Sequence, residues 1–124
     1  MPKRQSINGS RARHENASRI GAIVMSSVIG GANPGSRELP PSLEQQVANV
    51  FAHIRHDVEA AGGSVDDIIK VTFWVNDPVN QRAALNAEWV KMFPDPAARP
   101  ARHTLPLPPD SRAMVQADFT AVLP

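Results

Sequence analysis

The chain has 124 residues, enough for one domain with a hydrophobic core but not for two, so we expect a single domain over residues 1–124. Thirteen basic residues against twelve acidic ones leave a net charge of +1, which gives no overall field that would attract nucleic acid. Because the chain has no cysteine, disulfides, thiolate catalysis and cysteine-ligated metal sites are excluded.

The first 17 residues are mostly polar and supply either a short edge strand or a mobile arm. A basic cluster, Lys3, Arg4, Arg11 and Arg13, has no aromatic residues between its members on which bases could stack, so we interpret it as a solvated tail. No apolar segment typical of a secretory signal follows this cluster, and no apolar run reaches the roughly 20 residues of a membrane span. We therefore expect a cytoplasmic protein without a membrane partner.

A buried strand is predicted over residues 20–27, because this apolar run stops well before helix length. The Gly- and Pro-rich segment 30–35 indicates a turn, and Pro40-Pro41 closes the loop that follows. The pair Gly30-Gly31 lacks the pattern and the lysine of a phosphate-binding loop, so nucleotide binding is not expected.

The first helix is predicted to begin after Ser42, with Ser42 as N-cap and Gln45 reaching back to it in a capping box. Apolar residues then recur at helical spacing: Leu43, Val47, Val50, Phe51, Ile54, Val58 and Ala61. Gly62-Gly63 ends this helix, with one glycine in the left-handed conformation. His53 and His56 fall away from the apolar stripe, so we interpret them as part of a solvated face and not as a metal site.

The second half of the chain predicts a strand over 69–75, a helix from Asp77-Pro78 to Phe93, and strands over 101–107 and 112–123. The residues expected on the buried face of the first of these strands are Ile69, Val71, Phe73 and Val75. The apolar stripe of the helix is Leu85, Trp89, Met92 and Phe93. In the last strand Ala113, Val115, Ala117, Phe119 and Ala121 share one face, opposite Met114, Gln116, Asp118 and Thr120.

The order strand, helix, strand, helix, strand, strand indicates an α+β fold with two helices on one face of a mixed sheet. The other sheet face then meets water or another subunit. Because Trp74, Met114 and Val122 fall on faces away from the main apolar stripes, we expect that face to be buried by oligomerisation.

Arg99 and Arg102 lie in the segment 99–104, just after the second predicted helix. A guanidinium fixed on a short strand is a good receptor for a carboxylate, because its planar fork donates two parallel hydrogen bonds. The alternative is that both arginines are surface charges.

Several short blocks recur in order along residues 20–122. They are the strand end Ser26-Ser27, Gln45-Gln46, residues 59–64 followed by 66–72, Leu85-Asn86 with Phe93, and Pro100-Ala101-Arg102. Together these blocks resemble the RidA (YjgF) family of small enamine and imine deaminases. The resemblance implies a chorismate-mutase-like fold, a homotrimer with clefts between subunits, and cofactor-free hydrolysis of 2-imino or 2-enamino acids to 2-keto acids and ammonia.

The resemblance also implies roles for individual residues. Arg102 matches the arginine that clamps the substrate carboxylate, and Asn86 matches an asparagine reached from a neighbouring subunit. A cleft-lining serine falls on Ser27, with Ser26 as the alternative. No metal or other cofactor is implied.

The chain departs from the family pattern at four positions. Gln116 stands where a glutamate usually orients or activates the water, and an amide cannot take the proton. His14 falls on the usual tyrosine position and is a candidate general base, with an exposed histidine as the alternative. Val28 and His103 replace small residues, and strand alternation puts His103 on the face opposite Arg102.

These departures leave the function open between hypotheses that share a small carboxylate as ligand. The first is hydrolytic deamination, with Gln116 and His14 placing the water. The second is a carboxylate-binding trimer without turnover, which the missing glutamate supports. Asp118 is interpreted as an ion-pair residue and not as a replacement base. A ribonuclease is a third hypothesis, which the near-neutral charge disfavours.

Overall fold

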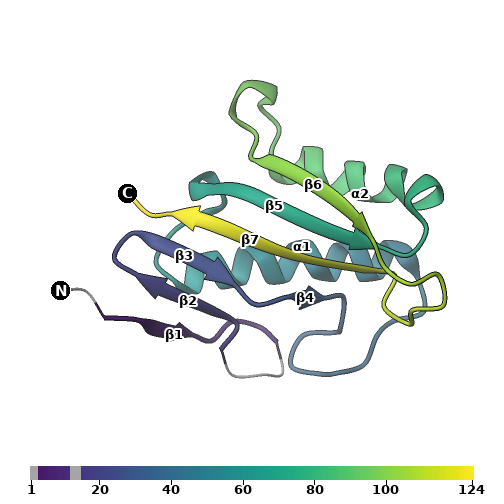
Figure 1. The fold of residues 1–124 in the computed structure, drawn as a ribbon, viewed down its shortest axis with the longest axis horizontal. Coiled ribbons are helices and arrows are strands. Elements are labelled where there is room, and N and C mark those ends of the chain that lie inside the picture. Colours follow the sequence, from purple (N-terminus) through teal and green to yellow (C-terminus); the bar gives the residue numbers. More distant parts are fainter. Residues whose placement is uncertain (1–2, 12–14) are drawn as a thin grey trace.

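The computed structural model describes residues 3–11 and 15–124 and shows two helices on one face of a mixed β-sheet (Figure 1). The elements are β1 (Gln5–Ile7), β2 (Ala17–Ile20), β3 (Ile23–Ser26), β4 (Ile29–Gly30), α1 (Leu43–Ala60), η1 (Val65–Asp67), β5 (Ile68–Val75), α2 (Pro78–Met92), η2 (Pro96–Ala98), β6 (Ala101–Pro106) and β7 (Val115–Val122), where η marks a short 3-10 helix. The sheet order is β1-β2-β3-β7-β5-β6, and β4 also pairs with β7. Only β5 and β6 run parallel among the described pairs. The predicted α+β class is confirmed.

The apolar run predicted as one buried strand over 20–27 instead holds the end of β2, a turn and β3, and Val24 is its one buried residue. β2 and β3 pair antiparallel with Ile20 opposite Ile23, which leaves Gly21 and Ala22 as the turn. Gly21 has a φ of 56°, a conformation that glycine adopts without steric cost. β1 pairs with the outer edge of β2, so residues 5–7 form the edge strand that was one of the two alternatives for the N-terminal segment.

The first predicted helix is confirmed as α1. The Oγ of Ser42 accepts a hydrogen bond from the backbone N–H of Gln45 at 3.2 Å, which makes Ser42 the N-cap. The reciprocal half of the predicted capping box is wrong, because the Gln45 side chain turns along the helix and donates to Asn49 Oδ1 at 2.9 Å. Gly62 follows the helix with a φ of 96°, the left-handed conformation that was predicted.

The prediction that His53 lies on a solvated face is wrong. Its side chain is 1% exposed, with Nδ1 2.5 Å from Ser10 Oγ and Nε2 2.7 Å from the carbonyl oxygen of Ala32. A buried imidazole is tolerated in a protein interior when both ring nitrogens have partners, and these contacts supply them. His56 is exposed, as predicted.

The strand β5 buries Val71, Phe73 and Val75 as predicted but leaves Ile69 54% exposed. The register between β5 and β7 shifts between Ile68 and Lys70, which inserts one residue into β5. Ile68 therefore takes the buried position that the alternation had assigned to Ile69.

The predicted stripe of α2 is confirmed, since all four of its residues are buried: Leu85, Trp89, Met92 and Phe93. In β7 the buried residues are Val115, Ala117, Phe119 and Ala121, each 1% exposed or less. These side chains pack with those of α1 into one core between the sheet and the helices.

The face of the sheet away from the helices carries large apolar side chains that are exposed. Met25 of β3 is 59% exposed and Val122 of β7 is 42% exposed, and each alternates with buried neighbours on its strand. Leu105 lies 42% exposed on β6. Among the described residues, no helix combines the length and the apolar character needed to cross a membrane.

Candidate functional site

Arg102 lies on β6 beside α2. It pairs in parallel register with Val71, whose side chain is buried, so Arg102 projects on the helix side of the sheet. Its guanidinium carbon lies 5.0 Å from the ring centre of Trp89 and 5.3 Å from that of Phe73. Its Nη1 donates a hydrogen bond to Asn86 Oδ1 at 2.9 Å. The two rings and the amide fix the plane of the guanidinium and leave further N–H groups for a ligand.

The contact between Arg102 and Asn86 is made within one chain. The resemblance to the family implied an asparagine reached from a neighbouring subunit, whereas here α2 brings Asn86 to the arginine of its own chain. Within one chain Asn86 thus accepts a hydrogen bond from Arg102, and its approach from a neighbouring subunit stays a prediction.

A pocket of about 170 Å³ opens beside Arg102, against α2 and the strands β5 and β6. Its described lining contains no acidic residue and consists of Val75, Pro78, Gln81, Arg82, Leu85, Arg102 and Thr104. Burial, and next the charge of Arg82, lower the pKa of Arg102. Because a free guanidinium titrates above about 12, Arg102 remains a cation at ordinary pH. The pocket is a positively charged recess.

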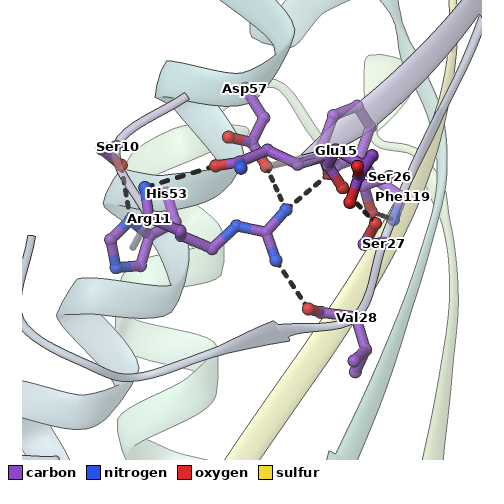
Figure 2. Close-up of polar contacts among 10 residues, drawn as sticks. Ser10, Arg11, Glu15, Ser26, Ser27, Val28, His53, Asp57 and Phe119 are labelled. Atoms are coloured by element: carbon purple, nitrogen blue, oxygen red, sulfur yellow. Dashed lines mark hydrogen bonds and ion pairs between the residues drawn. The ribbon is translucent and has the colours of Figure 1, made fainter. Parts of the chain in front are cut away.

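The two candidate serines are engaged in hydrogen bonds near the end of β3 (Figure 2). Ser26 Oγ accepts from the backbone N–H of Phe119 at 2.9 Å. Ser27 Oγ donates to the carbonyl oxygen of Glu15 at 2.5 Å, and the Ser27 N–H donates to the carbonyl oxygen of Asn16 at 3.0 Å. Neither serine is among the described residues that line the pocket beside Arg102.

Gln116 lies beside a different recess, of about 550 Å³, whose polar lining also includes Arg11, Glu15 and Arg37. Its neighbours on β7, Val115 and Ala117, are fully buried against the helices, so Gln116 projects from the opposite face of the sheet. Within the described part of the chain, its amide makes no hydrogen bond and remains available.

The structure thus brings Arg102 and Asn86 together but keeps both apart from Gln116. Arg102 projects on the helix side of the sheet and Gln116 on the other side. Within one chain the two residues therefore line different recesses.

The remaining candidates fall outside these two recesses or outside the described residues. His14 belongs to the latter group. His103 is exposed on the face opposite Arg102, as predicted from strand alternation. Arg99 donates from Nε to a backbone carbonyl beyond α2 at 2.8 Å. Burial raises the pKa of Asp118, and the charge of Lys70 opposes that rise.

A buried ion pair between Arg11 and Asp57 was missed from the sequence (Figure 2). Arg11 Nη2 lies 2.8 Å from Asp57 Oδ2, and the two side chains are 7% and 0% exposed. The same guanidinium donates to the carbonyl oxygens of Asn16 and Val28, at 2.5 and 2.6 Å. The interpretation of Arg11 as part of a solvated tail is therefore wrong, because it anchors the N-terminal segment to α1.

Burial has the largest effect on the pKa values of Asp57 and His53 beside this ion pair. It raises the pKa of Asp57 to about 6, although the charge and hydrogen bond of Arg11 act in the opposite direction. It also lowers the pKa of His53, which lies one helical turn before Asp57. The i, i+4 spacing of this polar pair, directly beside Ile54 and Val58 of the apolar stripe, was the available sequence signal.

Among residues 3–11 and 15–124, no group of three or more histidine or acidic side chains is arranged to hold a metal ion.

Known proteins similar to this chain place it in a family. Residues 6–113 match the family described as endoribonuclease L-PSP. The chain is 31% identical to the 2-iminobutanoate/2-iminopropanoate deaminase of Escherichia coli (strain K12) over 102 residues, which cover 79% of each chain. It is 32% identical to a RutC family protein of Haemophilus influenzae over 74 residues, 60% of this chain and 56% of that one.

Solved structures show the same fold at lower identity. Protein YjgH superposes with a TM-score of 0.85 at 23% identity, covering 98% of this chain and 97% of that one. A hypothetical protein from Giardia lamblia superposes with a TM-score of 0.86 at 19% identity, covering 98% of this chain and 100% of that one.

The fold and the geometry above define an α+β protein with a cationic recess at the parallel edge of its sheet. The match over residues 6–113 and the 31% identity to the Escherichia coli protein then show that the chain belongs to the RidA (YjgF) family, also described as the L-PSP family.

Proposed function

We propose that the protein hydrolyses small 2-imino or 2-enamino carboxylic acids to 2-keto acids and ammonia, without a cofactor. The observation that carries this proposal is the guanidinium of Arg102, stacked on Trp89 and held by Asn86 in a recess whose described lining is free of acidic residues. A permanently charged and preorganised fork favours a planar carboxylate. The identity to a protein named 2-iminobutanoate/2-iminopropanoate deaminase supports the substrate class.

The reaction needs the substrate carboxylate to be held in place and a water molecule to be positioned next to the imine carbon. The water oxygen forms a bond to the imine carbon while the C=N π electrons take up a proton at nitrogen, which gives a carbinolamine. The hydroxyl oxygen then loses its proton and forms the C=O bond as the C–N bond breaks, and the nitrogen, having gained that proton, leaves as ammonia. Arg102 holds the carboxylate next to that carbon, while the amide of Gln116 orients the water. Because an amide accepts a hydrogen bond but not a proton, His14 or the substrate nitrogen takes the proton from the water.

We include in this proposal a homotrimer of the chorismate-mutase-like type, with each cleft built from two copies. The sheet separates Arg102 from Gln116 within one chain, so a shared site takes Arg102 from one copy and Gln116, with Ser27, from the next. The exposed apolar side chains on the open sheet face, such as Met25 at 59%, support its coverage by another copy.

Sedimentation velocity tests the assembly. We expect the mass of three chains for the wild type and a smaller species for Met25→Lys, because a charge placed on a buried apolar interface is costly. Val90→Lys, on the exposed side of α2 at 46% exposure, is the matched control and should keep the wild-type mass. A monomeric wild type, or a trimer unaffected by Met25→Lys, contradicts the assembly.

Turnover is tested with 2-iminobutanoate or 2-aminoacrylate generated in place by a dehydratase or lyase, following the release of keto acid with and without the protein. Arg102→Gln removes the charge and should lower kcat/KM by about 100-fold, since charge-assisted hydrogen bonds contribute about 1.5–3 kcal/mol each. Arg102→Lys keeps the charge but lacks the planar fork, so its kcat/KM should lie between those of the wild type and Arg102→Gln. The proposal fails if the protein accelerates none of several such substrates.

A second candidate function is carboxylate binding without turnover, which the amide at Gln116 favours. In that case the wild type binds 2-oxobutanoate but does not hydrolyse imines, and Gln116→Glu gains hydrolysis because it restores a proton acceptor. If the wild type turns over and Gln116→Glu changes kcat only within a factor of a few, the binding-only function is excluded.

A further inference from the structure

A second arginine, Arg82 on α2, also lines the pocket beside Arg102, and this residue is exposed. The two cations are close enough for the charge of Arg82 to lower the pKa of Arg102. None of the seven described residues that line the pocket is acidic, and within residues 3–11 and 15–124 Arg82 makes no hydrogen bond or ion pair.

Arg82 shares the lack of a described polar partner with Arg4, Arg37 and Arg112, but of these it is the one that lines the pocket beside Arg102. Most arginines with described contacts meet a carboxylate or a carbonyl oxygen: Arg11 with Asp57, Arg55 with Glu59, Arg19 with the carbonyl oxygens of Gly21 and Ala61, and Arg99 with that of Phe93. Arg82 faces another cation instead. Arg102 is half-buried and Arg82 is exposed, so the two like charges repel one another across a partly open recess, and an anion bound between or beside them removes that repulsion.

The other polar groups of the pocket do not neutralise it. The Gln81 side chain is occupied at the start of α2, where its Oε1 accepts from the Asp77 N–H and its Nε2 donates to Asn76. Thr104 carries a neutral hydroxyl. Arg102 gives one N–H to Asn86 and keeps the rest. Two arginines thus line the pocket, each with hydrogen-bond donors to spare.

We propose that Arg82 receives a second carboxylate of the ligand, so that this pocket selects small dicarboxylic acids over monocarboxylic acids of the same length. This inference rests on the proposed function, in which Arg102 holds the carboxylate next to the reacting carbon. The pocket volume of about 170 Å³ is small beside the roughly 300–1,000 Å³ of sites for drug-sized ligands, which suits an acid of four or five carbons. The substrate class is then the 2-imino and 2-enamino dicarboxylic acids.

Binding of stable keto acids tests the selectivity without requiring turnover. 2-Oxoglutarate and 2-oxopentanoate have the same five-carbon chain and differ in the terminal carboxylate, so isothermal titration calorimetry of both measures what the second anion adds. We expect the wild type to bind 2-oxoglutarate about 10- to 100-fold more tightly, the range for charge-assisted hydrogen bonds. Arg82→Gln should bring that ratio close to one, and Arg82→Lys should keep part of it.

Arg55→Gln is the matched control, because it removes the same charge from an exposed helix position whose partner Glu59 lies 3.9 Å away. The ratio of its affinities for 2-oxoglutarate and 2-oxopentanoate should stay at the wild-type value. This result separates a local contact from the loss of one positive charge overall. A wild type that binds both acids equally, or an Arg82→Gln variant that retains the preference, overturns the inference. Sedimentation velocity and circular dichroism of each variant show whether its fold and assembly are intact.

Turnover of the corresponding imines distinguishes this inference from the proposed function. 2-Iminoglutarate and 2-iminopentanoate can be formed from glutamate and norvaline by an amino acid oxidase with oxygen as oxidant and catalase to remove peroxide. If neither imine is hydrolysed but 2-oxoglutarate is preferred through Arg82, the deaminase function fails and the second carboxylate subsite stands. If both imines are hydrolysed at equal kcat/KM, the deaminase function stands and the subsite is overturned.

Discussion

Replacing Arg11 by methionine tests how the N-terminal segment is held. The Arg11 guanidinium lies 2.8 Å from the Asp57 carboxylate, which is fully buried on α1. Methionine keeps much of the apolar volume of the side chain but leaves Asp57 without its counter-ion. Removing one member of a buried ion pair costs about 3–5 kcal/mol of unfolding free energy when the remaining group stays charged.

The destabilisation caused by Arg11→Met should depend on pH, and the direction of that dependence follows from the pKa of Asp57. Burial raises this pKa from 3.8 to about 6, so the folded protein binds a proton that the unfolded chain releases between these values. The unfolding free energy contributed by Asp57 is therefore highest below pH 4 and falls as pH rises through 6, by about 3 kcal/mol for two units. Without Arg11 the folded pKa rises further, so the fall continues to higher pH.

Urea unfolding followed by tryptophan fluorescence at fixed protomer concentration measures this effect between pH 5 and pH 8. The destabilisation caused by Arg11→Met should be several kcal/mol at pH 8 and clearly smaller at pH 5, where Asp57 is protonated. The imidazoles of His53 and His56 lie nearby, so the same substitution in an Asp57→Asn background is the control and should have little pH dependence. Equal destabilisation at pH 5 and pH 8 would falsify this account of the buried pair.

Two further substitutions test the packing of this cluster and the orientation of the candidate receptor. A Cβ at Gly9 would lie 1.9 Å from Asp57 Oδ1, so Gly9→Ala should lower the unfolding free energy in urea by about 1–3 kcal/mol. A Cβ at Gly30 meets nothing within 4 Å, so Gly30→Ala is the control and should not lower it. Equal losses for the two variants contradict the geometry. Asn86→Ala removes the acceptor of Arg102 Nη1 and should weaken 2-oxobutanoate binding about tenfold by calorimetry; unchanged binding means that Asn86 does not orient the arginine.

The parts of the fold that the sequence could predict are those with a long, regular pattern. The helices α1 and α2 and the alternation of β7 follow directly from spacing, because burial of one face repeats every 3.6 or 2 residues. The apolar run at 20–27 has no such period, and only the φ of Gly21 decides that it turns. The exposure of Ile69 depends on a bulge, which is a property of the pairing with β7 and not of the strand alone.

In the candidate site, too, the sequence could predict what depends on neighbouring residues but not what depends on contacts between distant ones. Arg102 could be singled out because the residues around it resemble a known family motif. The burial of Asp57 could not, since its partner Arg11 is 46 positions away and looks like part of a basic tail. Arg82 carried no signal for a similar reason: it is an exposed helix residue, and only the packing of β6 against α2 places it in the same pocket as Arg102.

Arg102 and Gln116 lie on different faces of the sheet, so the binding of an acid and its hydrolysis depend on different parts of the molecule. One chain alone holds the charged recess, because Arg102, Asn86 and Arg82 all lie where β6 meets α2. The side chain proposed to orient the water projects from the other face, so in the proposed trimer a neighbouring copy supplies it. In this arrangement the affinity for an acid is a property of the protomer, whereas hydrolysis is a property of the assembly. Substitutions on the open sheet face should therefore affect turnover before they affect binding, and that order separates the proposed enzyme from one whose site is complete within a single chain.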